Sequence, residues 1–565
     1  MPVSLLPSFF PMTANPPKKA KWYWNALGIV LMLWCLGGVN VLLLRDIPLL
    51  LFIGTGIGLF CLPMARWFGR PPRHWITFVW SFGVLTGMYA LLLFVIPPFS
   101  ISRQTTWLTE PRSKELYGID YAAVIEKQLD PGVLPGDNGF RLLTETLGRP
   151  FFGENFEEKH WVRVCQYLDL PPEIEPKRTF IGWWEYTKAL QEEEGEIISK
   201  DEVYEERLRP YSAEAIPIVR RWLDENEAAL DLFVAAAGKR VLYVPPMFDG
   251  LLMEAICIND HLCREMARGL MVRVRYRLAV GETNQAWDDV LVMYRLTELH
   301  RQAIWNQVSS LVNDAIVRIA YSSAEEVLFH SEWTSDEIRQ KADEIVPFLQ
   351  PLSEDEIKML IRNERFSALD SMQRLLEEEA PQDFWDWFKR KNLRASVRRG
   401  YAMVEINQRF DEMEQQFFSD TPVLDVEMDR DFIRLALWYG KVRAIPIMVG
   451  RIMSDLQHPV FDSHRTSIRT RHANVLLVRL VFALEAFKRD NGGVYPDKLA
   501  DLQGRYIDEV PLDPFSGEPF RYVLKQPEDG RPELWLYSVG PNGLDDEGRN
   551  WNDFPKGDDV RRILN

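Results

Sequence analysis

Three residues that bind metals in many proteins lie close together in the sequence: His458, Asp462 and His464. Imidazole nitrogens and carboxylate oxygens are common ligands of zinc and related ions. The three residues are therefore a candidate metal site, although ligand-type residues at such short spacing also occur by chance. Two other histidines, His300 and His330, fall on amphipathic stretches, and we expect them at the surface or at the boundary of the core.

The common catalytic motifs are missing from the sequence. It contains no HExxH, GxSxG, Walker A or GxGxxG pattern, each of which places reacting groups at a defined turn or helix face. We therefore predict that the chain is not an enzyme. An enzyme with an unrecognised site, in a cleft of the helical region described below, is the alternative.

Charge is distributed unevenly along the chain. Beyond residue 100 there are 59 Lys and Arg against 81 Asp and Glu. A domain with this balance repels phosphate backbones, so we predict no nucleic-acid partner. Two local runs stand out, one acidic and one basic. The acidic run could bind cations, and the basic run could bind anions or lipids. We favour the simpler interpretation that both are solvated helix faces. They are Glu192, Glu193, Glu194 and Glu196, and Lys389, Arg390, Lys391, Arg394, Arg398 and Arg399.

The five cysteines have no metal-binding spacing. Cys35 and Cys61 lie in apolar segments, whereas Cys165, Cys257 and Cys263 lie in the polar remainder. No two of them form a CxxC pair, which gives zinc or thioredoxin-type chemistry no support. The last three either contribute one disulfide in an oxidising compartment or are small buried residues with free thiols.

Three apolar stretches near the N-terminus predict membrane-spanning helices. Residues 22–44, 47–65 and 75–97 contain no Asp, Glu, Lys, Arg or His. A helix needs about 20 apolar residues to cross the hydrocarbon, and one charge at its centre would cost about 2.5–3.5 kcal/mol. GxxxG spacings in the second and third spans favour either dimerisation or close packing among the three helices.

Flanking basic residues predict the orientation of these spans. The segment before the first span and the loop between the second and third carry three basic residues each, namely Lys18, Lys19, Lys21, Arg66, Arg70 and Arg73. Lys and Arg are enriched on the cytoplasmic side of membrane proteins. We therefore predict a multi-pass protein of the bacterial cytoplasmic membrane, with everything after residue 98 outside the cytoplasm.

The middle of the chain has helical periodicity. Residues 99–139 look like an extended connector with several prolines, and residues 140–460 repeatedly place apolar residues three or four apart. In one segment a helix ends at Gly281, and Ala286 lies on the contact face of the next helix, which resembles one tetratricopeptide-like hairpin. We predict an irregular α-helical array, and such arrays usually bind proteins.

The C-terminal 100 residues carry the most specific pattern. A helix over residues 470–490 ends at Asp490-Asn491-Gly492-Gly493, and a strand is predicted at Glu533–Ser538. Tyr495-Pro496, Asp513-Pro514, Gly517, Pro519 and Tyr522 lie between them, and Gly540, Asn542 and Gly543 follow. This order resembles the soluble domain of the major pseudopilin of type II secretion. With its helical middle, the chain also resembles a group of bacterial membrane proteins of uncharacterised function.

The resemblance implies a small α+β domain at residues 465–565 and a calcium-binding final loop. Transferred to this sequence, its ligands are Ser538, Asn542, Asp545, Asp546, Asp558 and Asp559. Oxygen ligands of this kind suit Ca²⁺. The family has Asp where Asn542 stands, and residues 550–556 interrupt the loop. Because the module lies far from any membrane span, assembly into a filament is not implied.

Together these patterns predict a mainly α protein with a three-helix transmembrane anchor at residues 1–98. Its function is predicted to be that of an extracytoplasmic scaffold with a protein partner on the helical array. Besides the enzyme alternative given above, a second alternative function is that of an accessory component of a secretion or pilus-like machine, which the pseudopilin resemblance supports.

Overall fold

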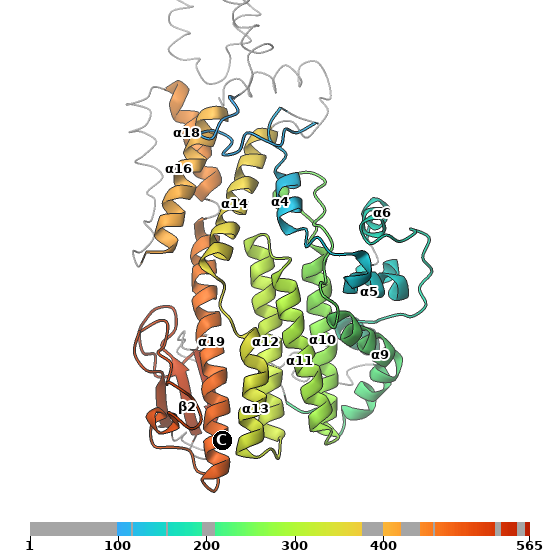
Figure 1. The fold of residues 1–565 in the computed structure, drawn as a ribbon, viewed down its shortest axis with the longest axis vertical. Coiled ribbons are helices and arrows are strands. Elements are labelled where there is room, and N and C mark those ends of the chain that lie inside the picture. Colours follow the sequence, from blue (N-terminus) through green and yellow to red (C-terminus); the bar gives the residue numbers. More distant parts are fainter. Residues whose placement is uncertain are drawn as a thin grey trace, which may run out of the picture. The chain divides into compact units, whose positions relative to one another are not determined.

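The computed structural model describes residues 99–114, 117–153, 156–194, 209–375, 399–419, 441–455, 458–525, 533–550 and 560–564. This part of the chain is mainly helical (Figure 1), which confirms the predicted fold class at that level. The three predicted spans fall in residues 1–98, outside the described residues. Among the helices that are described, none has both the length and the apolar composition of a membrane crossing.

The helices vary from two turns to nine. The α-helices of the described residues are α4 (Tyr121–Leu129), α5 (Gly139–Leu147), α6 (Glu158–Tyr167), α7 (Trp183–Glu194), α9 (Ile216–Ala237), α10 (Ile258–Ala279), α11 (Thr283–Arg301), α12 (Gln307–His330), α13 (Ser335–Ile345), α14 (Glu354–Arg374), α16 (Arg399–Phe417), α18 (Lys441–Asp455) and α19 (His458–Asp490). Short 3₁₀ turns are η1 (Pro135–Asp137), η2 (Arg149–Phe152), η3 (Leu252–Glu254), η4 (Val346–Phe348) and η5 (Leu499–Leu502).

The chain divides into two compact units, which we describe separately. The first comprises Met1–Ile119, Ser371–Arg409 and Leu424–Ser454, and the second comprises Asp120–Asp370, Phe410–Val423 and Asp455–Asn565. The boundaries fall inside α14 and α16, so the units are not consecutive segments of sequence.

In the first unit, α16 and α18 pack closely. A Cβ atom added to Gly450 would lie 2.5 Å from the carbonyl oxygen of Ala402, so only glycine permits this approach. Arg451 Nε lies 2.7 Å from Glu405 Oε1 and joins the same two helices. The chain before α4 is held by side-chain bonds to its backbone: Asn407 Nδ2 donates to the carbonyl of Gln104 at 3.0 Å.

In the second unit, α9 to α12 form an array in which successive helices pack side by side (Figure 1). The predicted hairpin is confirmed: α10 ends at Ala279, Gly281 has a φ of +83°, and α11 begins at Thr283. Positive φ is a conformation that glycine adopts without strain. Ala286 is completely buried in the contact between the helices, as predicted.

The core of this array is aromatic where α11 meets its neighbours. Trp287 lies edge-on to Trp333, with ring centroids 5.4 Å apart, and it also contacts Phe482 of α19. All three are buried. Aromatic residues of this size bury 150–250 Å² each and dominate the packing energy of a core. Helix α19 packs along α12 and α13 and so belongs to the same hydrophobic core.

One helix lies in the segment predicted as a connector. Helix α4 begins after Asp120, whose side chain accepts a hydrogen bond from the backbone N–H of Ala123 at 3.0 Å. Tyr121, Ile125 and Leu129 are buried at helical spacing. Extended structure throughout residues 99–139 was therefore the wrong prediction, because the nearby prolines obscured a short capped helix.

The C-terminal strands form an antiparallel sheet of three strands in the order β1-β2-β3. They are β1 (Arg521–Lys525), β2 (Glu533–Ser538) and β3 (Val560–Leu564). Leu534 faces Leu524 on one side and Leu564 on the other. The sheet packs against α19 through β2 and β3. The predicted strand at Glu533–Ser538 and the end of the helix at Asp490 are both confirmed.

Candidate functional site

Glu157, His160 and Asp249 form a compact group of metal-ligand types in the described residues. One potential ligand atom from each lies within 4.8 Å of the other two. Glu157 is the residue before α6, His160 is in the first turn of α6, and Asp249 is in the loop between α9 and α10. His160 Nε2 shares a hydrogen bond with Asp249 Oδ2. The helix start and the loop therefore place the three side chains together.

A lysine lies between the two carboxylates of this cluster. Lys159 Nζ is 2.5 Å from Asp249 Oδ2 and 3.1 Å from Glu157 Oε2. The hydrogen bond from Lys159 is the largest cause that holds the pKa of Asp249 below its ordinary value, with a smaller contribution from His160. Asp249 is thus ionised at neutral pH, and the cluster presents two negative oxygens and one imidazole nitrogen.

His160 is fixed more firmly than its two acidic neighbours. It is 2% exposed, and its ring lies 5.8 Å from that of Phe156. Its Nδ1 atom has no hydrogen-bond partner within the described residues. Both carboxylates are at the surface and can rotate, so the imidazole sets the position of the cluster.

This cluster is not apparent in the sequence. Glu157 and His160 are three residues apart, but Asp249 is 89 residues from His160. The sequence gives the helical spacing of the first pair, and only the fold brings the loop to it.

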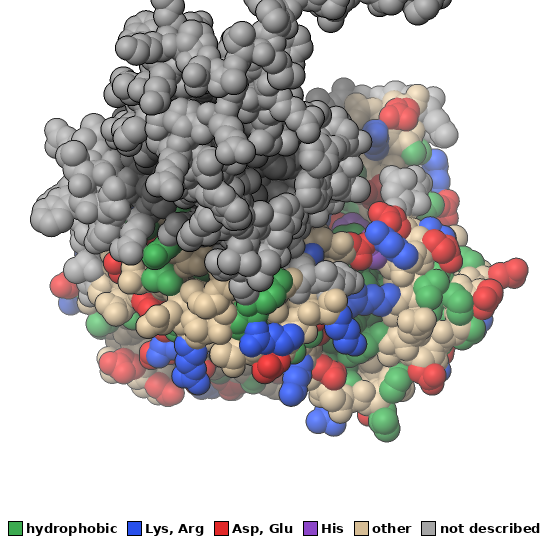
Figure 2. Space-filling view, turned by 90° about the horizontal axis from the view of Figure 1, so that it is seen from above, with side chains coloured by type: hydrophobic (Ala, Val, Ile, Leu, Met, Phe, Trp, Pro, Cys, Tyr) green, Lys and Arg blue, Asp and Glu red, His purple; other side chains and the backbone are tan. Residues whose placement is uncertain are grey.

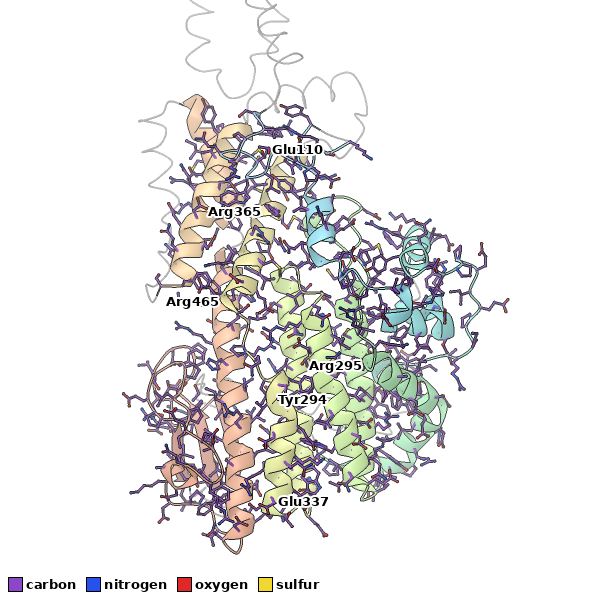
Figure 3. The ribbon with its side chains drawn as sticks, in the orientation of Figure 1. Glu110, Tyr294, Arg295, Glu337, Arg365 and Arg465 are labelled. Atoms are coloured by element: carbon purple, nitrogen blue, oxygen red, sulfur yellow. The ribbon has the colours of Figure 1, made fainter. Side chains whose placement is uncertain are left out.

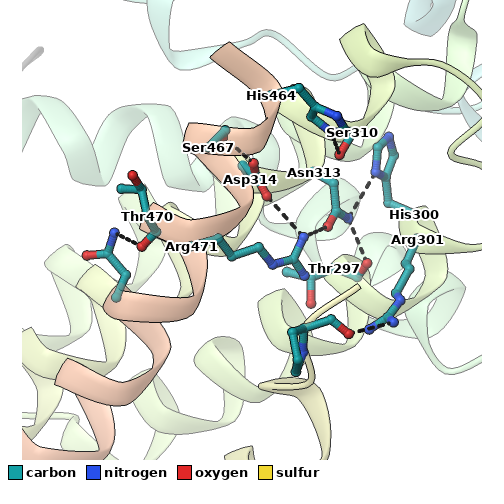
Figure 4. Close-up of polar contacts among 12 residues, drawn as sticks. Thr297, His300, Arg301, Ser310, Asn313, Asp314, His464, Ser467, Thr470 and Arg471 are labelled. Carbon is teal, nitrogen blue, oxygen red and sulfur yellow. Dashed lines mark hydrogen bonds and ion pairs between the residues drawn. The ribbon is translucent and has the colours of Figure 1, made fainter. Parts of the chain in front are cut away.

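A second group of polar residues is buried in the helical array, and Figure 4 shows the part of it that runs from His300 through Asn313 to Arg471. Asp260 Oδ1 lies 2.8 Å from His300 Nε2, and Asp260 Oδ2 accepts a hydrogen bond from Ser309 Oγ at 2.8 Å. The amide of Asn313 donates to His300 Nδ1 at 3.1 Å, so the ring proton lies on Nε2 and is donated to Asp260. Ser309 bonds to the carboxylate and not to the imidazole, which is unlike a Ser-His-Asp triad.

The same group extends from α12 to α19. Arg471 Nη1 donates to Asn313 Oδ1 at 2.7 Å and to Asp314 Oδ1 at 3.0 Å. Ser467 Oγ donates to Asp314 Oδ2 at 2.7 Å (Figure 4). Burial raises the pKa of Asp314, and Arg471 opposes this rise. Because these groups satisfy one another inside the protein, their role is to hold α10, α11, α12 and α19 in one arrangement.

The structure places the sequence-predicted histidines in different surroundings. His464 is buried, and its Nε2 lies 2.9 Å from Ser310 Oγ. The side chains of His458 and Asp462 are outside the described residues. His300 is completely buried, so its predicted place at the surface or the boundary of the core was wrong. Its polar partners Asp260 and Asn313 come from neighbouring helices, which the periodicity of one helix does not reveal. His330 is exposed, as expected.

The three described cysteines are free thiols. Cys165 and Cys263 are buried and Cys257 is partly buried. Burial raises the pKa of Cys165 to about 11 and that of Cys257 to about 12. Thiols with such values carry almost no thiolate at neutral pH and are poor nucleophiles.

Four of the six residues predicted to bind calcium are described, and they lie at the end of β2 or within the eight residues after it. Asn542 Nδ2 donates to Asp546 Oδ2 at 3.0 Å, so the structure brings these two together. Asp545 accepts a hydrogen bond from Tyr537 at 3.1 Å and forms an ion pair with Arg521 at 3.2 Å. Asp558 and Asp559 are outside the described residues.

Asp513 organises this end of the domain. It is buried and accepts hydrogen bonds from Ser538 Oγ at 2.8 Å and from the backbone N–H of Val539 at 3.0 Å. The side chain of Ser538 is therefore bonded to protein, and its backbone carbonyl is the oxygen predicted to bind calcium. The Asp513-Pro514 pair was part of the resemblance, but its role as the anchor of β2 was not predicted.

The charge runs lie mostly outside the described side chains. Glu192 is exposed near the end of α7, and Glu196 is not described. Of the basic run, only Arg399 is described, and it is buried at the start of α16, where its Nη1 donates to the backbone carbonyl of Gln373.

No family model matches this chain, and none of the curated proteins or solved structures compared with it is significantly similar.

Proposed function

We propose that this chain is a membrane-anchored scaffold of the bacterial envelope and that its extracytoplasmic helical array binds a protein partner. The observation that carries the proposal is the array itself, in which the inner faces of α10, α11, α12 and α19 are locked together by buried polar contacts. Stacked helical arrays commonly offer extended surfaces to other proteins. The membrane anchor comes from the sequence of residues 1–98.

Ionic contacts between α10 and α11 strengthen this framework. Arg273 binds both carboxylate oxygens of Asp289, at 2.9 and 2.6 Å, and Arg277 Nη1 lies 2.7 Å from the same carboxylate. Bidentate contacts of this kind fix the angle as well as the distance between two side chains. A surface held in one arrangement loses less conformational entropy when a partner binds.

The outer side of α12 offers a contact point for a partner. Val308 is 59% exposed and Leu311 is 37% exposed, and they lie three residues apart, on one side of the helix. Acidic and basic side chains are mixed with scattered apolar ones on the described surface in Figure 2. A mixed surface with local apolar contacts is typical of protein interfaces, whose cores are depleted of charge.

Photo-crosslinking in intact cells tests the proposal. A photoreactive amino acid replaces Val308 or Leu311 in the full-length protein, and Val494, which is exposed in the C-terminal domain, is the matched control position. We expect a discrete adduct with the same protein from both positions on α12 and none from Val494. Adducts from Val494 alone, or from no position, would contradict a partner site on this part of the array.

The alternative function has one observation in its favour. The long helix α19 packs against an antiparallel sheet of three strands, which is the type of layout that the pseudopilin resemblance implies. If a pull-down with the full-length protein recovers a secretin or a secretion ATPase, the protein is an accessory part of a secretion machine.

A further inference from the structure

We propose that Glu157, His160 and Asp249 bind a divalent transition-metal ion, with Zn²⁺ as the ion whose ligand preferences fit best. The three side chains supply one imidazole nitrogen and two carboxylate oxygens. Zinc sites with three protein ligands of these types keep a fourth position for water. The site is separate from the loop predicted to bind calcium and from the partner surface on α12.

The three ligand atoms must move slightly closer together to bind one ion. The ligand atoms lie within 4.8 Å of one another, whereas two ligands of a tetrahedral zinc ion lie about 3.3–3.6 Å apart, since each bond is about 2.0–2.2 Å long. His160 is held by burial, and the two carboxylates are exposed. Rotation of the carboxylates can therefore close the site around an ion without a change in the backbone.

The buried imidazole is the second observation that points to a ligand. His160 is 2% exposed and directs Nε2 toward Asp249, while its Nδ1 has no hydrogen-bond partner in the described part of the chain. The nitrogen that faces the cluster is Nε2, which already contacts Asp249, so Nε2 is the atom that would coordinate an ion. Coordination through Nε2 gives the buried ring a strong interaction that a carboxylate at the protein surface provides only in part.

Lys159 shows where positive charge is stabilised. Its ammonium group contacts both carboxylates, at 2.5 and 3.1 Å, and its side chain is 58% exposed. An exposed lysine is flexible and gains little from such a pair, so a divalent ion can displace it. Lys159 is therefore an internal competitor of the metal.

The donor set decides the class of metal. Imidazole suits zinc and neighbouring transition metals, whereas calcium and magnesium prefer sites made only of oxygen. A bound ion would join the start of α6 to the loop between α9 and α10. At this position the ion clamps the loop onto the helix, and its fourth coordination position is left for water.

Zinc titration of the purified full-length protein, after treatment with a chelator, tests the site. We expect calorimetry to show one zinc equivalent that is weakened at least about tenfold by Asp249→Asn and by His160→Gln, because loss even of groups that only support a metal ligand costs 10–100-fold. Glu158→Gln is the control, since Glu158 is in the same turn of α6 but pairs with Arg149. We expect this variant to bind zinc like the wild type.

Lys159→Met separates a metal site from a plain ion-pair cluster. If Lys159 competes with the metal, its removal tightens zinc binding and increases the rise in Tm on zinc addition. If the cluster is only an ion pair, Lys159→Met does not increase the affinity for zinc. Zinc binding that is the same in wild type, Asp249→Asn and His160→Gln, or no binding in wild type and Lys159→Met, would overturn the proposal.

Discussion

His464 is buried beside Ser310 at the contact of α19 with α12, and burial lowers its pKa to about 4. An unfolded histidine has a pKa of about 6.5. Between these values the unfolded chain binds more protons than the folded one, so stability falls as pH decreases from about 6.5 to 4 and this contribution is constant below 4. The full loss is about 3 kcal/mol.

Denaturant unfolding at several pH values, with wild type compared to His464→Gln, measures this contribution. The buried carboxyls Asp314 and Glu325, whose pKa values burial raises, titrate in the same direction in both proteins. The difference between the two proteins therefore isolates His464. We expect the variant to lose less stability on acidification, and parallel pH profiles would contradict burial of a neutral His464.

Because of the ionic contact between α10 and α11, we expect that removal of one carboxylate strongly lowers the free energy of unfolding. Asp289→Ala leaves Arg273 buried with one fewer counter-charge, and we expect a loss of about 3–5 kcal/mol in the free energy of unfolding. Asp231→Ala removes another partner of Arg273, but the Asp231 side chain is 68% exposed, and we expect a loss below about 1 kcal/mol. Equal losses in the two variants, measured by urea unfolding, would refute a buried framework here.

For single residues, the sequence indicated which histidines could take part in polar contacts but not which residues they contact. His300 was predicted at the surface or the boundary of the core because the sequence of its own helix contains no information about the helices that pack against it. Its partners Asp260 and Asn313 are 40 and 13 residues away. The same limit hid Asp249 from His160, because helical spacing determines which residues share a face but not which loop packs against that face.

Among the helices, α13 has the clearest local determinant. Thr334 and Glu337 form a reciprocal capping box at its start, where Figure 3 labels Glu337. Thr334→Ala removes the acceptor for the backbone N–H of Glu337, and we expect a loss of about 1 kcal/mol in the free energy of unfolding. Thr334→Ser keeps the hydroxyl and is the control. A loss as large in the serine variant would mean that the methyl group, and not the cap, matters.

The loop after β2 is predicted to bind calcium. We expect added Ca²⁺ to raise the Tm of the full-length protein and Asp558→Ala to abolish the rise, because an ion that binds only the folded state stabilises it. Asp545 already contacts Arg521 and Tyr537. A second variant, Arg521→Gln, removes the ion pair, and we expect a larger rise in Tm with Ca²⁺ because the carboxylate of Asp545 is then available to the ion. A wild-type Tm that does not respond to Ca²⁺ would exclude the site.

Local patterns predicted elements where one residue determined the geometry. Gly281 predicted the end of α10, because glycine adopts a positive φ without strain, and the short apolar run within residues 533–538 predicted β2. Helix α4 was missed because it is only nine residues long and lies among prolines. The sheet order could not be predicted, since the pairing of β2 with β3 joins strands separated by a long loop.

For the whole molecule, the sequence predicted a mainly helical protein but not how the chain divides into compact units. The hydrophobic periodicity of each helix reports burial and not the identity of the neighbour. Thus α19, which the sequence assigned to the C-terminal domain, also packs along α12 and α13 of the array. Segments far apart in sequence meet here through contacts such as that of Arg471 with Asn313, which no local pattern contains.

The acidic helical body is proposed to lie outside the cytoplasm on a three-span anchor, and fusions to a reporter enzyme test this topology. Alkaline phosphatase, which is active only after export, is fused after Asn565, and a second fusion is made after Arg73 in the predicted cytoplasmic loop. We predict activity from the fusion after Asn565 and none from the fusion after Arg73. An inactive Asn565 fusion together with an active Arg73 fusion would contradict the account.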